Sequence, residues 1–374
     1  LNYGTETLYS EGLIIKTSLN TNLQYLAEES LIKGLIKYDK NQGWRGVVGN
    51  LNQFNLKFED VINEIKNPFP NKWFLTKVEK IDSAKLLLNG NKLKNIEIDL
   101  TDHSNKWLIN QKFKINDLLF VEKLNLTYVI RQIPNVNGAI IVTDPFSGDI
   151  LAMSGGFSFN LSQFNRSTQA KRQPGSAFKP FVYISALKKG YTPSTLILDA
   201  PYVIDQGPGL PKWKPANYSD EFYGLTTMRT GIEKSRNLMT IRLANKIGVE
   251  TILSSAKDFN IQKYLDKNMS MSLGSGLVTL IDLTNAYGII ANGGKKIKPN
   301  IIKSIYSRNG KKILDNSNKF CNNCKLEIIN INSKLPEIKN NAKEVLDPKI
   351  AYQITSMMEG VIERGTAKSL KELK

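Results

Sequence analysis

Histidine is nearly absent from this 374-residue sequence, and its scarcity excludes several kinds of chemistry. The one histidine, His103, lies in a polar stretch, residues 101–105, far along the chain from any candidate nucleophile. A Ser-His-Asp triad would have to use it, and a zinc site would usually need more ligands than one His and two Cys. We therefore expect no metal and no cofactor, and in a serine enzyme we expect lysine to be the base.

Long apolar runs are also missing from the chain. No segment approaches the roughly 18 apolar residues that a membrane-spanning helix needs. Residues 1–9 contain no basic start followed by an apolar stretch, so no secretory signal opens the sequence. There is no starting methionine either, and we expect a piece of a longer protein, with whatever directs it to its compartment missing or outside the piece.

The chain has no dense basic tract with interleaved aromatic residues, although Lys and Arg outnumber Asp and Glu by 51 to 34, a net charge of +17. Such a balance could indicate nucleic acid, an anionic membrane or an acidic polymer as a partner. The lysines are scattered, however, and asparagine is abundant beside them, which is typical of a genome rich in A and T. We therefore predict that the chain binds no nucleic acid.

Hydrophobic periodicity indicates a β-rich segment between two parts of another character. A strand at residues 12–17 and a helix with apolar residues at helical spacing from Leu23 to Tyr38 open the chain. From about residue 43 to residue 131, short β-type runs predict a small barrel or sandwich. The clearest of these runs are Trp73–Val78, Ala84–Leu88 and Leu118–Val121.

A hairpin opens the remaining part, with strands at residues 139–143 and 149–153 around a turn that contains Asp144 and Gly148. Beyond it the chain becomes mainly helical. The length exceeds one typical domain of about 100–200 residues, so we expect two. We assign residues 1–40 and 133–374 to a larger α/β domain and residues 41–132 to a small β domain inserted into it.

A serine and a lysine three residues apart stand out at the start of a predicted helix. A Pro-Gly pair precedes Ser176, the helix should run to Lys189, and Pro180 falls in its first turn, where a missing N–H costs least. The spacing puts Ser176 and Lys179 on one face near the positive end of the helix dipole. That end disfavours a protonated lysine and favours a developing oxyanion, so we predict Ser176 as nucleophile and Lys179 as general base.

The Ser-x-x-Lys spacing alone is weak, because it also occurs at Ser30, Ser185 and Ser254. We interpret those three as helix surface or helix core. Ser176 differs from them in its Pro-Gly approach, its place at a helix start and the proline that follows its lysine.

A second motif, Ser235-Arg236-Asn237, precedes a predicted helix at residues 239–247. A serine there can relay a proton between Lys179 and a leaving amine, and an asparagine can orient the lysine and the substrate amide. The alternative is a loop that merely caps the helix.

These motifs occur in a context that resembles a known family, the class A penicillin-binding proteins. Arg172–Pro180 resembles the family's first motif and Ser235-Arg236-Asn237 its second, in the expected order. The other similar segments are Gly138–Gly156, Asp205–Tyr218, Met271–Gly276, Ala286–Gly294 and Gly43–Gly46 with the β region after it. Nearly the whole chain is covered, and the combination is highly specific.

The resemblance implies an α/β (α+β) transpeptidase fold related to that of β-lactamases. The reactive serine would open a central helix beside an antiparallel sheet, and the inserted β domain would be an OB-like barrel. The implied activity is that of a serine D,D-transpeptidase, in which Ser176 is acylated by the penultimate D-alanine of a peptidoglycan stem peptide. β-Lactams would trap the acyl-enzyme, Ser235 would relay protons, and Asn237 would position Lys179 and the substrate amide.

Members of this class carry an upstream membrane anchor and a glycosyltransferase domain. The resemblance therefore implies a bifunctional parent at the periplasmic face of a bacterial inner membrane, with other cell-wall synthesis proteins as partners. Two further hypotheses stay open. One is a β-lactamase or β-lactam sensor with the same Ser-Lys chemistry, and the other is a non-catalytic cell-wall scaffold.

The family's third motif, Lys-Thr-Gly, is missing from the sequence. Arg229-Thr230-Gly231 is the nearest match, but it precedes Ser235, whereas the family's motif follows the second one. In the family this motif lies on a strand of the central sheet that binds substrate. We therefore expect a chain cut before that strand, weak or inactive by itself, with an exposed edge on the hairpin at residues 139–153.

The two cysteines, Cys321 and Cys324, form a Cys-x-x-Cys in a polar loop. With no further Cys or His nearby, zinc is not expected there. A small structural disulfide would suit the cell-envelope setting that the resemblance implies.

Overall fold

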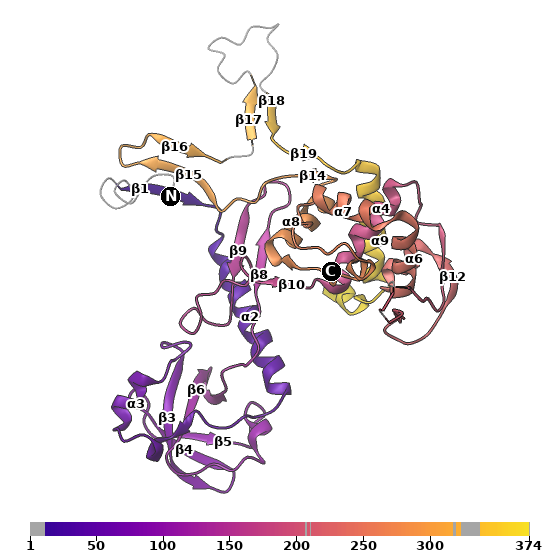
Figure 1. Cartoon of the computed structure of the whole chain (residues 1–374). Helices are drawn as coiled ribbons and strands as arrows, with labels where there is room; N and C mark the ends of the chain where they lie inside the picture. The colour runs from indigo at the N-terminus through magenta and orange to yellow at the C-terminus, as the bar shows by residue number, and fades with distance from the viewer. Residues whose placement is uncertain (1–11, 206–207, 210, 317–318, 323–336, 374) are drawn as a thin grey trace. The chain divides into compact units, whose positions relative to one another are not determined.

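The computed structural model describes residues 12–205, 208–209, 211–316, 319–322 and 337–373, with the backbone alone at 319–322 and 337–340. The chain divides into two compact units, each built from more than one segment of the chain (Figure 1). The larger unit comprises Leu1–Thr21, Ile141–Ala152 and Ala170–Lys374, and the smaller comprises Asn22–Ile140 and Met153–Gln169. No helix in the described ranges combines the length and the apolar character that crossing a membrane requires.

An antiparallel sheet forms the body of the smaller unit, with strand order β2-β6-β3-β4-β5 and β7 paired with β6. Its strands are β2 (Gly49–Asn50), β3 (Trp73–Asp82), β4 (Lys85–Asn89), β5 (Ile96–Asp99), β6 (Asp117–Leu124) and β7 (Thr127–Arg131). The three clearest runs predicted from the sequence correspond to β3, β4 and β6, so these predictions are confirmed. No pairing among the described strands closes the sheet into a barrel, and the OB-like assignment stays a prediction.

Both faces of the sheet are buried along β6, where five successive residues from Asp117 are buried and successive side chains point to opposite faces. Along β6, Leu118 and Phe120 belong to one apolar cluster, and Leu119 and Val121 belong to another. The helices of the unit are α2 (Thr21–Asn41) and α3 (Phe58–Glu64), and Leu51–Gln53 and Lys106–Leu108 form single 3-10 turns. The helix predicted near the start of the chain is therefore confirmed as α2.

The larger unit is built around one buried helix, α4 (Lys179–Lys188), in which every residue from Lys179 to Leu187 is buried. A helix that is apolar on all sides belongs in a core, and α4 packs against its neighbours α5, α6, α7 and α9 (Figure 1). These neighbours are α5 (Met228–Glu233), α6 (Asn237–Ile247), α7 (Val249–Asp258) and α9 (Pro348–Glu363), and α8 (Leu280–Ala291) adds to the same apolar cluster.

The larger unit also contains short strands. The strands β1 (Leu13–Thr17), β15 (Ile302–Ser307) and β16 (Lys312–Asp315) form a three-stranded sheet. Two-stranded sheets are formed by β8 (Ile140–Thr143) with β9 (Ile150–Ser154), β10 (Lys171–Arg172) with β13 (Val278–Thr279), β11 (Leu196–Asp199) with β12 (Gly224–Thr227), β14 (Lys295–Lys296) with β19 (Lys343–Glu344), and β17 (Lys319–Asn322) with β18 (Glu337–Asn340). The predicted hairpin is thus confirmed as β8 and β9.

The predicted disulfide between Cys321 and Cys324 cannot be placed in this fold, because Cys324 and the side chain of Cys321 lie outside the described residues. The prediction of a disulfide at this position therefore stays a prediction.

Candidate active site

Ser176 lies on a 3-10 turn, Gly175–Phe178, directly before α4. The predicted helix start is therefore displaced, and the cause is Pro180. Its missing N–H cannot bond to the Ser176 carbonyl four residues earlier, so the Lys179 N–H occupies that carbonyl in the tighter 3-10 pattern. The Ser176 side chain is exposed and makes no hydrogen bond to any residue within the described ranges.

Two contacts from distant parts of the chain hold this turn. Gly175 has a left-handed φ of 56°, and its N–H donates to the Gly274 carbonyl at 3.2 Å. A Cβ on Gly274 would lie 2.1 Å from the Gly175 oxygen, so no other residue fits there. On the other side, the Tyr287 hydroxyl of α8 donates to the Ala177 carbonyl at 2.8 Å. The turn that presents Ser176 is therefore fixed from both sides.

Lys179 is the first residue of α4, and only 2% of its surface is exposed. Its Nζ donates to the Ser235 carbonyl at 2.6 Å, to Ser235 Oγ at 3.0 Å and to Asn237 Oδ1 at 2.7 Å. Burial disfavours the charged ammonium and lowers the pKa of Lys179 to about 8. The structure thus brings three of the four predicted residues together, and the fourth, Ser176, lies one helical turn before Lys179.

The other Ser-x-x-Lys segments provide a contrast in the same molecule. Lys33, three residues after Ser30 on α2, is 71% exposed and forms an ion pair with Glu29 at 2.9 Å. The hydrogen bond that Lys33 donates to Glu29 raises the pKa of Lys33. Lys188, three residues after Ser185, likewise pairs with Asp258 at 2.9 Å. Only at Ser176 does the spacing coincide with a buried lysine that is bonded to uncharged oxygens.

Ser235 occupies the turn between α5 and α6 and has a left-handed φ of 54°. This conformation is unfavourable for any residue with a Cβ and costs roughly 1–2 kcal/mol. The turn is closed by N–H bonds from Ser235 to Ile232 and from Arg236 to Gly231, at 3.0 and 2.8 Å. In this strained conformation both the carbonyl and the hydroxyl of Ser235 accept hydrogen bonds from Lys179.

Asn237 begins α6, and an asparagine from a distant loop fixes its position. The Asn217 Oδ1 accepts the backbone N–H groups of Asn237 and Leu238, at 2.9 and 3.2 Å. It therefore does the work of an N-cap, which the N-cap residue Arg236 does not do with its own side chain. The Asn237 Nδ2 donates to the Ala216 carbonyl at 2.8 Å, so its Oδ1 is directed at Lys179.

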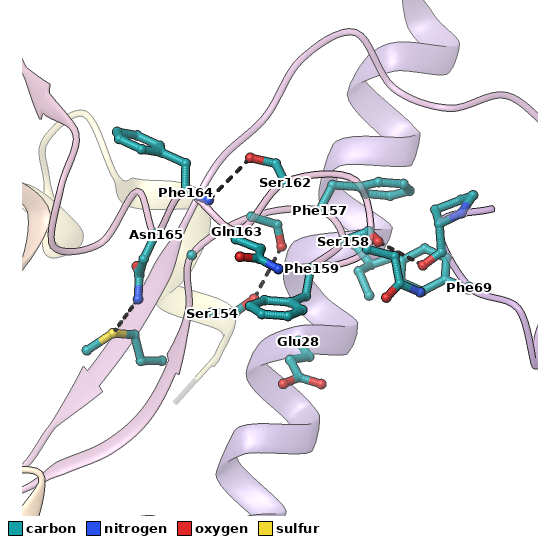
Figure 2. Close-up of a pocket in the computed structure, with 16 residues that line it drawn as sticks. Glu28, Phe69, Ser154, Phe157, Ser158, Phe159, Ser162, Gln163, Phe164 and Asn165 are labelled. Carbon is teal, nitrogen blue, oxygen red and sulfur yellow. Dashed lines mark hydrogen bonds between the residues drawn. The ribbon is translucent and has the colours of Figure 1, made fainter. Parts of the chain in front are cut away.

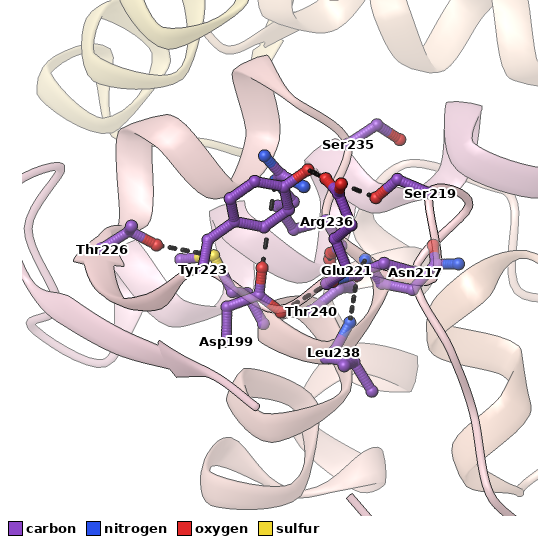
Figure 3. Close-up of polar contacts among 12 residues, drawn as sticks. Asp199, Asn217, Ser219, Glu221, Tyr223, Thr226, Ser235, Arg236, Leu238 and Thr240 are labelled. Carbon is purple, nitrogen blue, oxygen red and sulfur yellow. Dashed lines mark hydrogen bonds and ion pairs between the residues drawn. The ribbon is translucent and has the colours of Figure 1, made fainter. Parts of the chain in front are cut away.

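Behind Asn217 lies a buried carboxylate. Asp199, at the end of β11, is fully buried, and its Oδ1 accepts the Asn217 Nδ2 at 2.8 Å (Figure 3). Its Oδ2 has no hydrogen-bond partner among the described residues, and the Arg236 Nε lies 3.9 Å away. The Arg236 guanidinium is also stacked 3.2 Å from the centre of the Tyr223 ring. This network fixes which end of the Asn217 amide faces α6.

The end of α9 is anchored to the same turn. Arg364 Nη2 and Glu233 Oε1 form an ion pair at 2.5 Å, and Glu233 is only 5% exposed. The Thr366 N–H donates to the Glu233 carbonyl at 3.2 Å. A Cβ on Gly360 would lie 2.0 Å from the Glu233 carboxylate. Because Glu233 ends α5 two residues before Ser235, the residues around Arg364 support the site without reaching it.

Asn217, Asp199 and the Glu233–Arg364 pair were not predicted from the sequence. One signal for Asn217 was available, since the second motif places Arg236 immediately before the helix, and arginine is not a capping residue. An acceptor from elsewhere in the chain was therefore needed. No comparable local signal pointed to Asp199 or to Glu233.

The nearest match to the third motif and the single histidine both lie in described parts of the fold. Arg229-Thr230-Gly231 is part of α5, and the Arg229 Nη1 donates to the Ser356 carbonyl at 3.0 Å. His103 is exposed in the smaller unit. No group of three or more His, Cys, Asp or Glu side chains that could hold a metal occurs in the part of the chain that the structure describes.

Comparison with known proteins was made on sequence and on structure. The family model described as "Penicillin binding protein transpeptidase domain" matches residues 138–373. Penicillin-binding protein 1A of Rickettsia felis is 41% identical over an alignment 375 residues long, which covers 98% of this chain and 47% of that protein. Penicillin-binding protein 1A of Pseudomonas aeruginosa is 31% identical and covers all of this chain and 50% of its own length. The chain thus spans about half the length of the curated relatives it matches.

Solved structures show the same similarity at lower sequence identity. The crystal structure of penicillin-binding protein 1A from Haemophilus influenzae matches with a TM-score of 0.85 at 24% identity, over 99% of this chain and 58% of that one. The PonA1 protein of Mycobacterium tuberculosis, in complex with penicillin V, matches with a TM-score of 0.56 at 16% identity, over 96% of this chain and 67% of that one.

Proposed function

Because the chain belongs to the penicillin-binding protein transpeptidase family, we propose that it is the acyl-transferring part of a serine D,D-transpeptidase that cross-links peptidoglycan stem peptides. The observation that carries the proposal is the Nζ of Lys179, buried one helical turn after an exposed serine and bonded to Ser235 and Asn237. With its pKa at about 8, about a tenth of this lysine is neutral at pH 7. That fraction can accept a proton, which an ordinary surface lysine cannot do.

In the first half-reaction, neutral Lys179 removes the proton from Ser176 Oγ as the oxygen attacks the carbonyl carbon of the penultimate D-alanine. The tetrahedral oxyanion lies at the start of a helix, where backbone N–H groups lack intrahelical acceptors. The C–N bond then breaks, and the leaving D-alanine amine takes its proton from Lys179 through Ser235 Oγ. The product is an ester on Ser176.

In the second half-reaction, an amine of a neighbouring stem peptide attacks the ester carbonyl. It loses its proton along the same route through Ser235 to Lys179, the C–O bond to Ser176 breaks, and Ser176 Oγ recovers a proton. A β-lactam would acylate Ser176 in the same way, but its amine would stay attached after the ring opens. This explains why we expect penicillin to remain bound as a stable ester.

The parent protein is proposed to be larger than this chain, as its relatives are. We propose that it carries a glycosyltransferase domain and a membrane anchor, and that it acts at the periplasmic face of the bacterial inner membrane. Its partners would then be stem peptides that end in D-Ala-D-Ala, β-lactams and other cell-wall synthesis proteins. The inserted β domain, residues 41–132, is proposed to be OB-like.

Labelling the complete gene product with a fluorescent penicillin tests the proposed function. We expect stoichiometric labelling, its loss in Ser176→Ala, and unchanged labelling in the control variant Ser30→Ala, which alters another Ser-x-x-Lys. Labelling that survives Ser176→Ala would contradict the proposal. Rapid release of hydrolysed penicillin would instead favour a β-lactamase.

A further inference from the structure

A cavity of about 500 Å³ opens in the smaller unit, where residues 153–165 face α2 and the turn at Pro68 and Phe69 (Figure 2). None of the residues that line it belongs to the site around Ser176, so it is a separate feature. Its volume lies within the range of about 300–1,000 Å³ that is typical of small-molecule sites.

Buried contacts hold the floor of this cavity in place. Phe157 is 3% exposed, packs against Phe69 with ring centroids 5.1 Å apart, and donates its N–H to Asn137 Oδ1 at 2.9 Å. Ser158 is 6% exposed and donates its Oγ to the Pro68 carbonyl at 2.7 Å. A ligand would therefore meet a floor that is already formed, and little ordering would oppose binding.

The two ends of the loop over this floor are tied together. The Arg166 N–H donates to the Gly155 carbonyl at 3.0 Å. A Cβ on Gly155 would lie 2.4 Å from Asn165 Oδ1, which accepts the Ser167 N–H at 2.9 Å. Only glycine allows the backbone at position 155 to lie this close to Asn165, so the path of the loop is fixed.

The open side of the cavity presents aromatic rings and primary amides. Phe159 is 73% exposed and Phe164 is 46% exposed. Asn160 and Gln163 form no side-chain hydrogen bond to any other residue that the structure describes. Figure 2 draws Gln163 and Phe159 among the residues that line the cavity. Rings and amides that make few contacts within the protein are available to a ligand.

The lining contains almost no charge, although the chain as a whole carries +17. Its single ionisable side chain is Glu28, and no Lys or Arg is among the residues that line it. A phosphate or carboxylate ligand would meet no cationic lining residue, and the nearby Arg166 Nη1 already donates to the Gly155 and Phe164 carbonyls. A purely apolar ligand would leave the amides of Asn160 and Gln163 unpaired. The lining therefore favours a neutral ligand with both polar and apolar faces.

We propose that this cavity binds a neutral saccharide of the N-acetylhexosamine class. A pyranose ring offers an apolar C–H face to an exposed aromatic side chain such as Phe159. Its hydroxyl groups and acetamido group can donate to and accept from Asn160 and Gln163. The saccharide chemistry rests on the lining alone, and the choice of an N-acetylated sugar rests on the proposed function, because such sugars carry the stem peptides.

Calorimetric titration of the 374-residue chain with chitotetraose, a neutral tetramer of N-acetylglucosamine, tests the proposal. We expect saturable binding that weakens about tenfold in Phe159→Ala, weakens in Gln163→Ala and is retained in Phe159→Tyr. Phe146→Ala removes a ring that is 65% exposed in the other unit, and it serves as the matched control. Cellotetraose, which lacks the acetamido group, should bind more weakly.

The proposal fails if chitotetraose shows no saturable binding, or if Phe159→Ala and Phe146→Ala behave alike. Equal binding of cellotetraose would overturn the acetamido part. Penicillin labelling of the complete gene product should be unchanged in Phe159→Ala. Loss of sugar binding and loss of Ser176 chemistry are thereby separate results, and either proposal can fail alone.

Discussion

Lys179 combines two properties that a lysine seldom has together, since it is almost fully buried and its Nζ is bonded to three uncharged oxygen atoms. Burial penalises the ammonium form and lowers its pKa to about 8, and no counter-charge is needed to hold the neutral amine in place. The ammonium can donate to all three acceptors, whereas the neutral amine has two N–H groups for them and a lone pair free to accept a proton. Both properties are what a general base must have near neutral pH.

The pH dependence of acylation follows from this pKa. Protonated Lys179 cannot accept the Ser176 proton, so the second-order rate constant for penicillin acylation should fall about tenfold per pH unit below pH 8. Above pH 8 the amine is neutral, and the rate should level off. Stopped-flow acylation of the complete gene product between pH 5.5 and 9.5, at pH values about half a unit apart, measures the profile. A rate that is already level at about pH 6.5 would assign the base to another group.

Ser235 has a strained backbone and a hydroxyl bonded to Lys179. Two substitutions separate the effect of the strain on stability from the effect of the hydroxyl on acylation. Ser235→Ala and Ser235→Gly both remove the hydroxyl bonded to Lys179, so both should slow acylation by roughly 100-fold. Glycine adopts the left-handed φ of 54° without penalty, and alanine does not.

After allowance for the greater freedom of unfolded glycine, the Gly variant should be more stable than the Ala variant by roughly 0.5–1 kcal/mol. Urea unfolding of the two variants gives this difference, and the Ala variant is the control for the lost hydroxyl. An Ala variant that is the more stable of the two by about 0.4–1 kcal/mol would mean that position 235 carries no conformational strain.

At the scale of the element, the position of α6 depends on a cap supplied from outside the helix. The Asn217 side chain accepts two N–H groups of α6 and donates to Asp199, so the hydrogen bond between Asn217 and Asp199 can run in only one direction. Asn217→Asp would place two carboxylates against each other in a site where both residues are less than 5% exposed. We expect this variant to lose about 3 kcal/mol or more of stability and to acylate slowly.

Adding Asp199→Asn should reverse the damage. The new amide at position 199 can donate to the carboxylate at position 217, which still accepts the helix N–H groups and suits the positive end of α6. A double-mutant cycle in unfolding free energy and in acylation rate measures the recovery. If the two substitutions are simply additive, the direction of this hydrogen bond does not hold α6.

For the whole molecule, the fold class could be predicted from the family resemblance, and the site residues could be predicted from short local motifs. The α/β (α+β) transpeptidase fold predicted from the family resemblance is confirmed by the similar crystal structure. Ser176, Lys179, Ser235 and Asn237 could be named because the chemistry requires particular residue types at short spacing. Their catalytic roles and the domain boundaries at residues 40 and 132 stay predictions.

The residues that support the site were hidden because their contacts are formed between segments far apart in the chain. Asp199 and Asn217 meet through a loop, and Glu233 meets Arg364 only after α9 has packed against α5. Neither contact leaves a periodic or local pattern in the sequence. Such partners follow from the folded backbone, whereas the helix after Ser176 could be predicted from the local Pro-Gly pair and Pro180.

The contact between Gly175 and Gly274 has a consequence for how this protein can diverge. A methyl group at position 274 would collide with the backbone of the turn that presents Ser176, although Gly274 has no side chain that could act in proton transfer. Natural selection for catalysis therefore acts on Gly274 through its neighbour's backbone. A lineage that loses this glycine would lose the geometry of its nucleophile while keeping every reacting group.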